Sequence, residues 1–227
     1  MCGRFVQTAP PEALAARFRA VVGPGVPALL ARYNVPPSAP AYVVGYHPAL
    51  RRRGLTAMTW GLVPRWWEGH LRAAPKPANA VAETVEAKSF FRDSFRRRRC
   101  LVPVAGFYEW KAAGDAKAPY YVHPAVGGGF ALGGVWDVWT DPDTGEKRFS
   151  FAVLTTTPNE LVRAVHTRMP VVVPEAAWAE WLDPAAPLPG VRRLLVPLPA
   201  GRMAMHPVSP LVNATRNDGP ELLAPAA

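Results

Sequence analysis

The chain has 227 residues, enough to bury a sizeable core in one domain, and its two cysteines, Cys2 and Cys100, exclude a disulfide framework. No Cys/His cluster has metal-ligand spacing, no segment approaches the roughly 18 apolar residues of a membrane span, and no long apolar stretch suggests a signal peptide. From these absences we expect a cytoplasmic protein without metal, cofactor or membrane contact, and we expect it to be a monomer. The formal net charge of +9 favours a polyanionic partner.

The N-terminal half is predicted to contain helices, strands and one long loop. A helix that Thr8 caps should extend to Val22, because Leu14, Ala15 and Phe18 form an apolar face. The other expected elements here are strands over 3–8, 42–46 and 55–60, a loop over 63–79 and a helix over 85–98. The loop is dense in Pro, Trp and charge, and loops of this length in a compact domain are usually functional.

The C-terminal half is predicted to be rich in short strands separated by turn residues. The expected strands cover 100–104, 107–110, 120–123, 130–139, 149–155, 191–195 and 203–207. Short helices are expected over 159–165 and 175–182. Because strands and helices do not alternate as βαβ units would, we predict an α+β fold. The expected architecture is a single domain over 1–227, with a largely antiparallel or barrel-like β-sheet core and a few flanking helices.

Cys2 is the first candidate functional residue, because removal of Met1 would leave its α-amine and its thiol on one carbon framework. Small residues after Met favour that removal. The amine has a reference pKa near ~7.7 to 8.0 and the thiol near ~8.5, so both nucleophiles are partly available at neutral pH. Such an aminothiol can attack an amide, or condense with an aldehyde and close into a thiazolidine.

Three further residues could support chemistry at Cys2. Glu109 lies between aromatic residues in an apolar strand, where burial would raise the pKa of its carboxyl group toward the range useful for proton transfer. The alternative is a glutamate on a solvated strand face. His166, in a loop after a helix, could transfer protons or be structural. Asn79 ends the long loop, where an asparagine would ordinarily cap the next helix.

Arginine beside tryptophan in the long loop has the composition of a single-stranded DNA contact. Arg65 precedes Trp66 and Trp67, and base stacking on such rings contributes on the order of 1 to 3 kcal/mol per base. Because tryptophan is also common in cores, we expect one of the pair to be buried and the other to contact DNA. Arg4, beside Cys2, could hold the neighbouring phosphate.

Several segments together resemble the SRAP family, the SOS-response-associated peptidase-like proteins that shield abasic sites in single-stranded DNA. The segments that carry the resemblance are MCGRF (1–5), RYNVP (32–36), WGLVPRWW (60–67), NAVAET (79–84), GFYEW (106–110), HTRMP (166–170), PVS (207–209) and VN (212–213). They extend over nearly the whole chain, and their combination is specific although no single one is.

The resemblance implies a role for each matching position. Cys2, freed of Met1, would form a thiazolidine with the ring-opened aldehyde of an abasic site. Glu109 would move protons at the amine, His166 would handle the proton on the sugar ring oxygen or the 4′-hydroxyl, and Asn79 would orient the amine or the opened sugar. The implied DNA contacts are Arg4, Asn34, Arg65, Trp66, Trp67, Trp110 and Arg168.

The resemblance also implies a partner and one departure. The partner would be single-stranded DNA with abasic sites, at times at a junction with duplex, which would associate the protein with the nucleoid. Family members commonly carry an arginine as a phosphate contact two residues after Asn79, whereas this chain has Val81. One phosphate contact is therefore lost or supplied elsewhere, for example by Arg65.

Two other function classes remain open. Glutamine amidotransferases of the N-terminal-nucleophile class also begin Met-Cys-Gly, and this chain could be such a cysteine amidohydrolase or peptidase. Those enzymes typically use an Asn-Gly oxyanion motif, which is absent here. A plain nucleic-acid-binding module would leave Cys2, Glu109 and His166 without a role. The word peptidase in the family name suggests one further activity, the autoproteolytic removal of Met1.

Overall fold

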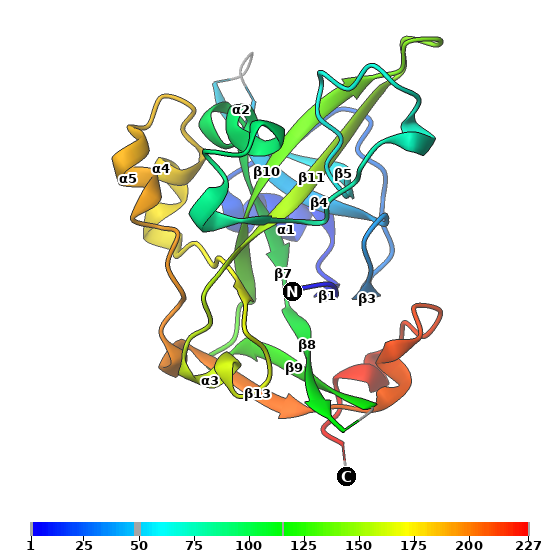
Figure 1. The fold of residues 1–227 in the computed structure, drawn as a ribbon, viewed down its shortest axis with the longest axis vertical. Coiled ribbons are helices and arrows are strands. Elements are labelled where there is room, and N and C mark those ends of the chain that lie inside the picture. The colour runs from blue at the N-terminus through cyan, green and yellow to red at the C-terminus, as the bar shows by residue number, and fades with distance from the viewer. Residues whose placement is uncertain (1, 48–50, 115, 227) are drawn as a thin grey trace.

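A closed barrel of five strands forms the centre of the molecule (Figure 1). The computed structural model describes residues 2–47, 51–114 and 116–226. The strands are antiparallel neighbours in the order β11-β10-β7-β4-β5, and a parallel pairing of β5 with β11 closes the ring. They are β4 (Pro40–His47), β5 (Arg52–Trp60), β7 (Arg99–Val104), β10 (Phe130–Thr140) and β11 (Lys147–Thr156).

Strand β7 is buried on both faces, as its alternating side chains show. In β7, Cys100 and Val102 point into the barrel, where they pack in one apolar cluster with Phe151. Leu101, between them, belongs to a second cluster outside the barrel. Every residue of β7 is accordingly buried, and Cys100 is a buried free thiol as the sequence indicates.

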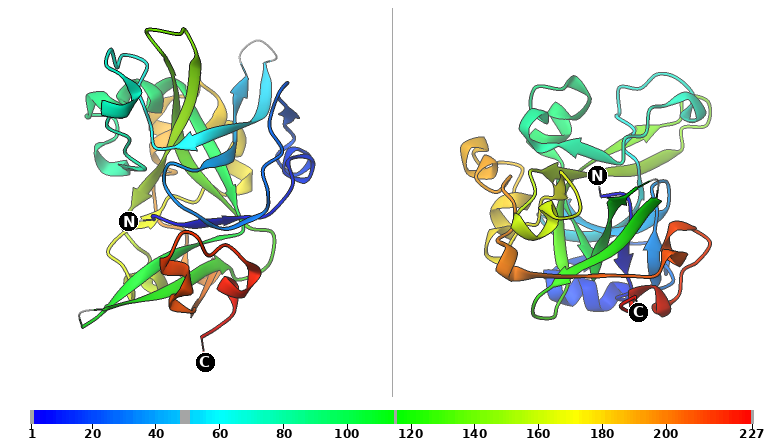
Figure 2. Two further views of the ribbon diagram at one scale, coloured as in Figure 1. Left: turned by 90° about the vertical axis from the view of Figure 1, so that its right-hand side faces the viewer. Right: turned by 60° about the horizontal axis from the view of Figure 1, so that its bottom comes forward.

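A second sheet extends below the barrel, in the order β13-β9-β8-β1-β3 (Figure 1). Its strands are β1 (Phe5–Gln7), β3 (Arg32–Val35), β8 (Gly106–Ala113), β9 (Ala116–Pro124) and β13 (Met203–Pro207). Since β1 pairs with β8 on one side and β3 on the other, the start of the chain lies at the junction of barrel and lower sheet (Figure 2).

Helices cover the outer face of the barrel. The helices are α1 (Pro11–Phe18), α2 (Ser89–Arg97), α3 (Glu160–Arg163), α4 (Trp178–Leu182) and α5 (Leu188–Arg192). Residues of α1, α2, α4 and α5 pack in the outer cluster, where Phe18 stacks on Trp178 at a centroid distance of 4.2 Å.

Short strands β2 (Val21–Val22), β6 (Asn79–Val81) and β12 (Met169–Pro170) complete the barrel sheet. Single 3₁₀ turns are η1 (Leu71–Ala73), η2 (Ala82–Thr84), η3 (Glu175–Ala177), η4 (Ala200–Arg202), η5 (Pro210–Asn213) and η6 (Pro220–Leu223).

The predicted fold class is confirmed: the protein is an α+β single domain with a barrel-like, largely antiparallel core. Two details of the first helix are wrong. Its N-cap is Pro10 rather than Thr8, and no side chain caps it. It ends at Phe18, because Arg19 takes the left-handed conformation with φ of 50°, and the following valines form β2 along β5.

Two later predictions are also wrong. Residues 191–195 form no strand, since α5 begins just after Pro187 and buries Val191 in the outer cluster. The helix expected over 85–98 begins only at Ser89. None of the helices within the described residues is long and apolar enough to cross a membrane.

Candidate active site

A cavity of about 450 Å³ opens where β1, β8 and the segment after α3 meet. It is lined by Gly3, Arg4, Glu109, Trp110, Lys117, His166 and Asn213. The residues come from the start of the chain, the β8–β9 hairpin, the segment after α3 and the turn η5, so the cavity exists only in the folded chain. Most of the lining groups are polar or charged, which suits a polar substrate.

Cys2 lies beside this cavity because strand pairing fixes the start of the chain. Phe5 pairs with Phe107, and the backbone N–H of Tyr108 donates to Arg4 O at 3.0 Å, which extends the contact with β8 toward Cys2. The Cys2 side chain has zero exposure and packs in the cluster inside the barrel. Burial, and secondly the charge of Glu109, raise the pKa of its thiol above the usual range.

Asn79 holds the backbone of Cys2. It begins β6, which runs parallel to β11 with Asn79 opposite Val153. Its Nδ2 donates to Cys2 O at 2.9 Å, while its Oδ1 is buried and accepts no hydrogen bond from any described residue. Asn79 is therefore a strand residue that positions the cysteine, and the ordinary interpretation as a helix cap is wrong.

Glu109 and His166 form a pair of titratable groups in the lining of the cavity. Glu109 shares its strand face with Phe107, which packs in the barrel cluster with Cys2, and its side chain is 1% exposed. Burial raises its pKa to about 7. His166 Nδ1 lies 3.9 Å from Glu109 Oε2 and 3.0 Å from both the N–H and the carbonyl oxygen of Arg168.

The two groups have complementary protonation states near neutral pH. Burial lowers the pKa of His166 below its usual value, so the imidazole is neutral at pH 7. Glu109, with a pKa of about 7, exchanges a proton in the same range. A carboxyl group and an imidazole of this kind can act as acid and base on one substrate. Within the described residues, no group of three His, Cys, Asp or Glu side chains is arranged to hold a metal ion.

Arg4 and Trp110 form the outer wall. The Arg4 guanidinium donates to Asn34 Oδ1 at 2.7 Å and to Val212 O at 3.0 Å, and it lies 5.7 Å from the Trp110 ring centroid. The Trp110 Nε1 donates to Asn213 Oδ1 at 2.7 Å. These contacts connect the start of the chain to the C-terminal segment, so the wall is rigidly assembled around Cys2.

Comparison with known proteins identifies the family. The family model described as SOS response associated peptidase (SRAP) matches residues 1–215. The chain belongs to the SRAP family. This membership confirms the resemblance carried by the eight sequence segments.

Curated relatives of this SRAP protein are named abasic site processing proteins. YoqW of Bacillus subtilis is 35% identical over 193 residues, which cover 84% of each chain. YedK of Escherichia coli is 26% identical, covering 99% of this chain and 100% of the relative. HMCES of Gallus gallus is 33% identical over 76% of this chain and 58% of its own length. A crystal structure of a protein from Bacteroides thetaiotaomicron superposes with a TM-score of 0.89 at 25% identity, covering 100% of both chains.

Asn34 and Arg168 are two expected DNA contacts of this SRAP protein, and both are hydrogen-bonded to other residues of the same chain. Asn34 has zero exposure and its Nδ2 donates to three carbonyl oxygens of the C-terminal segment. It therefore positions Arg4 and this segment, and DNA could reach it only if the segment moved. Arg168 binds Glu83 with both Nη groups, at 2.9 and 2.7 Å, and also donates to Thr155 O.

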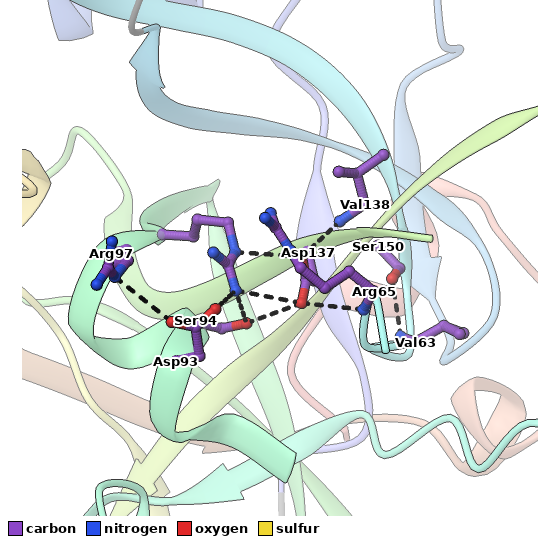
Figure 3. Close-up of polar contacts among 9 residues, drawn as sticks. Val63, Arg65, Asp93, Ser94, Arg97, Asp137, Val138 and Ser150 are labelled. Carbon is purple, nitrogen blue, oxygen red and sulfur yellow. Dashed lines mark hydrogen bonds and ion pairs between the residues drawn. The ribbon is translucent and has the colours of Figure 1, made fainter. Parts of the chain in front are cut away.

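The loop with Arg65, Trp66 and Trp67 contributes no residue to the lining of the cavity, and Arg65 is bound to Asp137 instead (Figure 3). Buried Asp137 accepts from Arg65 Nε at 2.9 Å and from its backbone N–H at 3.2 Å. In the register of the sheet Asp137 is opposite Ser150, three residues along β11 from the partner of Asn79 and so about 10 Å away.

The two tryptophans of this loop differ in burial, although neither is fully buried as was expected of one of them. Trp66 is 51% exposed and meets Phe90 of α2 edge-on, at 5.7 Å between centroids. Trp67 is half-buried against the small cluster of Val63 and Trp139, and its carbonyl accepts from Trp139 Nε1 at 2.8 Å.

Sequence reasoning missed two residues that line the SRAP cavity, Lys117 and Asn213, as functional candidates. Asn213 lies in a segment that carries the family resemblance, so a signal for it was available. Lys117 lies near the tip of the β8–β9 hairpin, and a single lysine near a turn carries no such signal.

Proposed function

We propose that this protein captures abasic sites in single-stranded DNA by a covalent bond to Cys2, after Met1 has been removed. The observation that carries the proposal is that Glu109 and His166 line one cavity, while Cys2, which Asn79 holds by its carbonyl oxygen, directly precedes Gly3 of the same lining. A lone cysteine would have little meaning, but a cysteine held by an amide and flanked by a carboxyl group with a pKa of about 7 has the parts that imine chemistry needs.

The proposed reaction has two stages and releases one water molecule. The α-amine of Cys2 attacks C1′ of the ring-opened deoxyribose, and the resulting carbinolamine loses water to give a Schiff base. The thiol then adds across the C=N bond, sulfur to carbon and hydrogen to nitrogen, which closes the thiazolidine. Glu109 takes a proton from the attacking amine and returns one to the departing hydroxyl, for which a pKa near 7 is well matched.

His166 is assigned the proton of the sugar. An abasic deoxyribose is mostly a closed ring, and opening it moves a proton from the 1′-hydroxyl to the ring oxygen that becomes the 4′-hydroxyl. A neutral imidazole held by the Arg168 backbone can carry that proton. By reversing the same step, His166 would favour closure of the sugar and release of the crosslink.

The partner we propose is single-stranded DNA, including strands that end in duplex beside the lesion. The net charge of +9 favours a polyanion, and exposed Trp66 beside Arg65 offers a stacking surface away from the cavity. The names of the relatives, abasic site processing proteins, support the lesion. We further propose that the protein acts as a monomer and associates with the nucleoid when bound to DNA.

The proposal is tested by incubating the Met-processed protein with an oligonucleotide that carries one abasic site, followed by denaturing electrophoresis. A heat-stable shifted band should form with the wild type and vanish with Cys2→Ala. Cys2→Ser retains the amine and should give weaker, less stable adducts. A shifted band of equal yield with Cys2→Ala would rule out the assigned nucleophile.

The alternative candidate is an N-terminal-nucleophile amidohydrolase or peptidase, favoured by the word peptidase in the family description. The same cysteine would then attack an amide. The first amide that such an enzyme would cleave is the Met1–Cys2 bond, so that removal of Met1 would be autocatalytic. An aminopeptidase could remove Met1 equally well. Retention of Met1 by Cys2→Ala and Glu109→Gln proteins in cells that process other Met-Cys termini would favour autocatalysis.

A further inference from the structure

The two cations that line the cavity, Arg4 and Lys117, differ in how far the protein already uses them. The Arg4 guanidinium donates to Asn34 Oδ1 and Val212 O and stacks beside Trp110. Its donors therefore serve to assemble the cavity wall. Without breaking these contacts a phosphate could bind only the Nε and Nη2 donors of Arg4, and Nη2 already lies 3.5 Å from Asn213 O.

The neighbouring positions, Arg168 and Val81, also offer no positive charge that is free to bind a DNA phosphate. Arg168 has both terminal nitrogens on Glu83 and one of them also on Thr155 O. Val81, which lies two residues after Asn79, is apolar. A strand of DNA entering the cavity would carry negative charge past Glu109 and Glu83 and needs a compensating cation.

Lys117 meets this need. It is the second residue of β9, its side chain is exposed, and it makes no hydrogen bond or ion pair with any residue in 2–47, 51–114 or 116–226. The sheet register places it opposite Ala112, two residues beyond Trp110 on the same face of β8. Lys117, an ammonium group on a flexible stem, thus lines the same cavity as the Trp110 ring.

We propose that Lys117 binds a backbone phosphate of the single strand that enters the cavity, while Trp110 contacts the adjoining base. This inference rests on the proposed binding of single-stranded DNA, and it assigns the charge that Val81 does not provide. Lysine is a suitable ligand here because a phosphate in a mobile single strand has no fixed direction, and an ammonium group binds it as a point charge.

The test measures binding of an unmodified single strand, without an abasic site, by fluorescence anisotropy over a series of salt concentrations. Lys117→Gln should reduce the slope of log K against log salt by about 0.7, the value for one phosphate contact on a single strand. Lys117→Arg should retain the wild-type slope. The matched control is Lys147→Gln, which removes the same charge from the exposed start of β11, about 20 Å along the strand from the partner of Asn79.

Two results would overturn the inference. An unchanged slope with Lys117→Gln would show that Lys117 contacts no phosphate, and an equal loss with Lys147→Gln would show a general effect of net charge.

The same proteins are assayed in parallel for crosslinking to abasic DNA, which separates the two proposals. If wild type crosslinks and Lys117→Gln keeps the full salt slope, only the role of Lys117 is wrong. If wild type binds the strand without crosslinking, the covalent function is wrong, and the slope still decides whether Lys117 contacts phosphate.

Discussion

At the scale of single residues, burial decides the chemistry of the site. Glu109 is 1% exposed, and the loss of water raises its pKa to about 7. The sequence predicted this from the aromatic residues on either side of it. The contact with His166 could not be predicted in this way, because the distance between the two side chains depends on how β8 and the segment after α3 meet in space.

The raised pKa of Glu109 predicts how stability depends on pH. The folded protein binds this proton more tightly than the unfolded chain, whose glutamate has a pKa near 4.5. The stabilisation by this proton is complete below about pH 4.5 and is lost as the pH rises to about 7. Over that window the free energy of unfolding of wild type should fall relative to Glu109→Gln by up to roughly 3 kcal/mol.

This difference is measured by urea unfolding of both proteins at intervals between pH 4.5 and 8. A constant difference across the window would mean that Glu109 titrates normally in the folded protein. The crosslinking rate should be lower for Glu109→Gln throughout, since an amide cannot transfer the proton.

At the scale of elements, two short segments owe their conformation to distant partners. Asn79 begins a strand because β6 pairs with β11, which follows much later in the chain. The residues 79–81 have no alternating pattern long enough to predict a strand, so local sequence indicated a loop. Likewise, α5 begins after Pro187 and buries Val191, whereas the valine and leucines of that segment favoured a strand.

The loop with Arg65 is fixed by one buried carboxylate (Figure 3). Asp137 accepts hydrogen bonds from Arg65, from Ser94 of α2 and from Arg98, which is itself buried. Asp137→Ala should therefore lower the free energy of unfolding by about 3 kcal/mol or more, because Arg98 would lose its buried partner. Asp93→Ala removes the half-exposed partner of Arg98 and should cost about 1 kcal/mol or less.

Chemical denaturation of the two variants checks this prediction. Comparable losses would mean that Asp137 contributes no more than a surface ion pair. The tryptophan fluorescence of native Asp137→Ala should also change, because Trp66 and Trp67 are next to the released Arg65.

At the scale of the whole molecule, the sequence predicted the fold class but not the closure of the barrel. Short strands with turns between them indicated an antiparallel or barrel-like sheet. The parallel contact of Ser150 and Phe151 with Thr59 and Trp60 closes the ring, and no local pattern encodes a pairing between such distant strands. That closure creates the apolar interior in which Cys2 is packed.

The net charge of +9 predicts that noncovalent binding to DNA depends on salt, whereas the covalent adduct should not. Noncovalent binding to single-stranded DNA should weaken steeply as salt rises from 50 to 200 mM, because phosphate contacts release counterions. A formed thiazolidine should persist at any salt concentration, since a covalent ring is not screened. Electrophoresis of samples shifted to high salt before and after incubation with abasic DNA separates the two kinds of binding. Loss of the preformed adduct at high salt would contradict a covalent bond.

The central claim, that Cys2 reacts as the first residue of the chain, is tested most directly by intact mass measurement. The Met-processed protein incubated with an abasic oligonucleotide should give one species whose mass is the sum of both reactants minus one water. A protein that carries an uncleavable extension before Cys2 has the thiol but no α-amine there, and it should give no such species. An adduct of equal yield and mass with the extended protein would contradict the account.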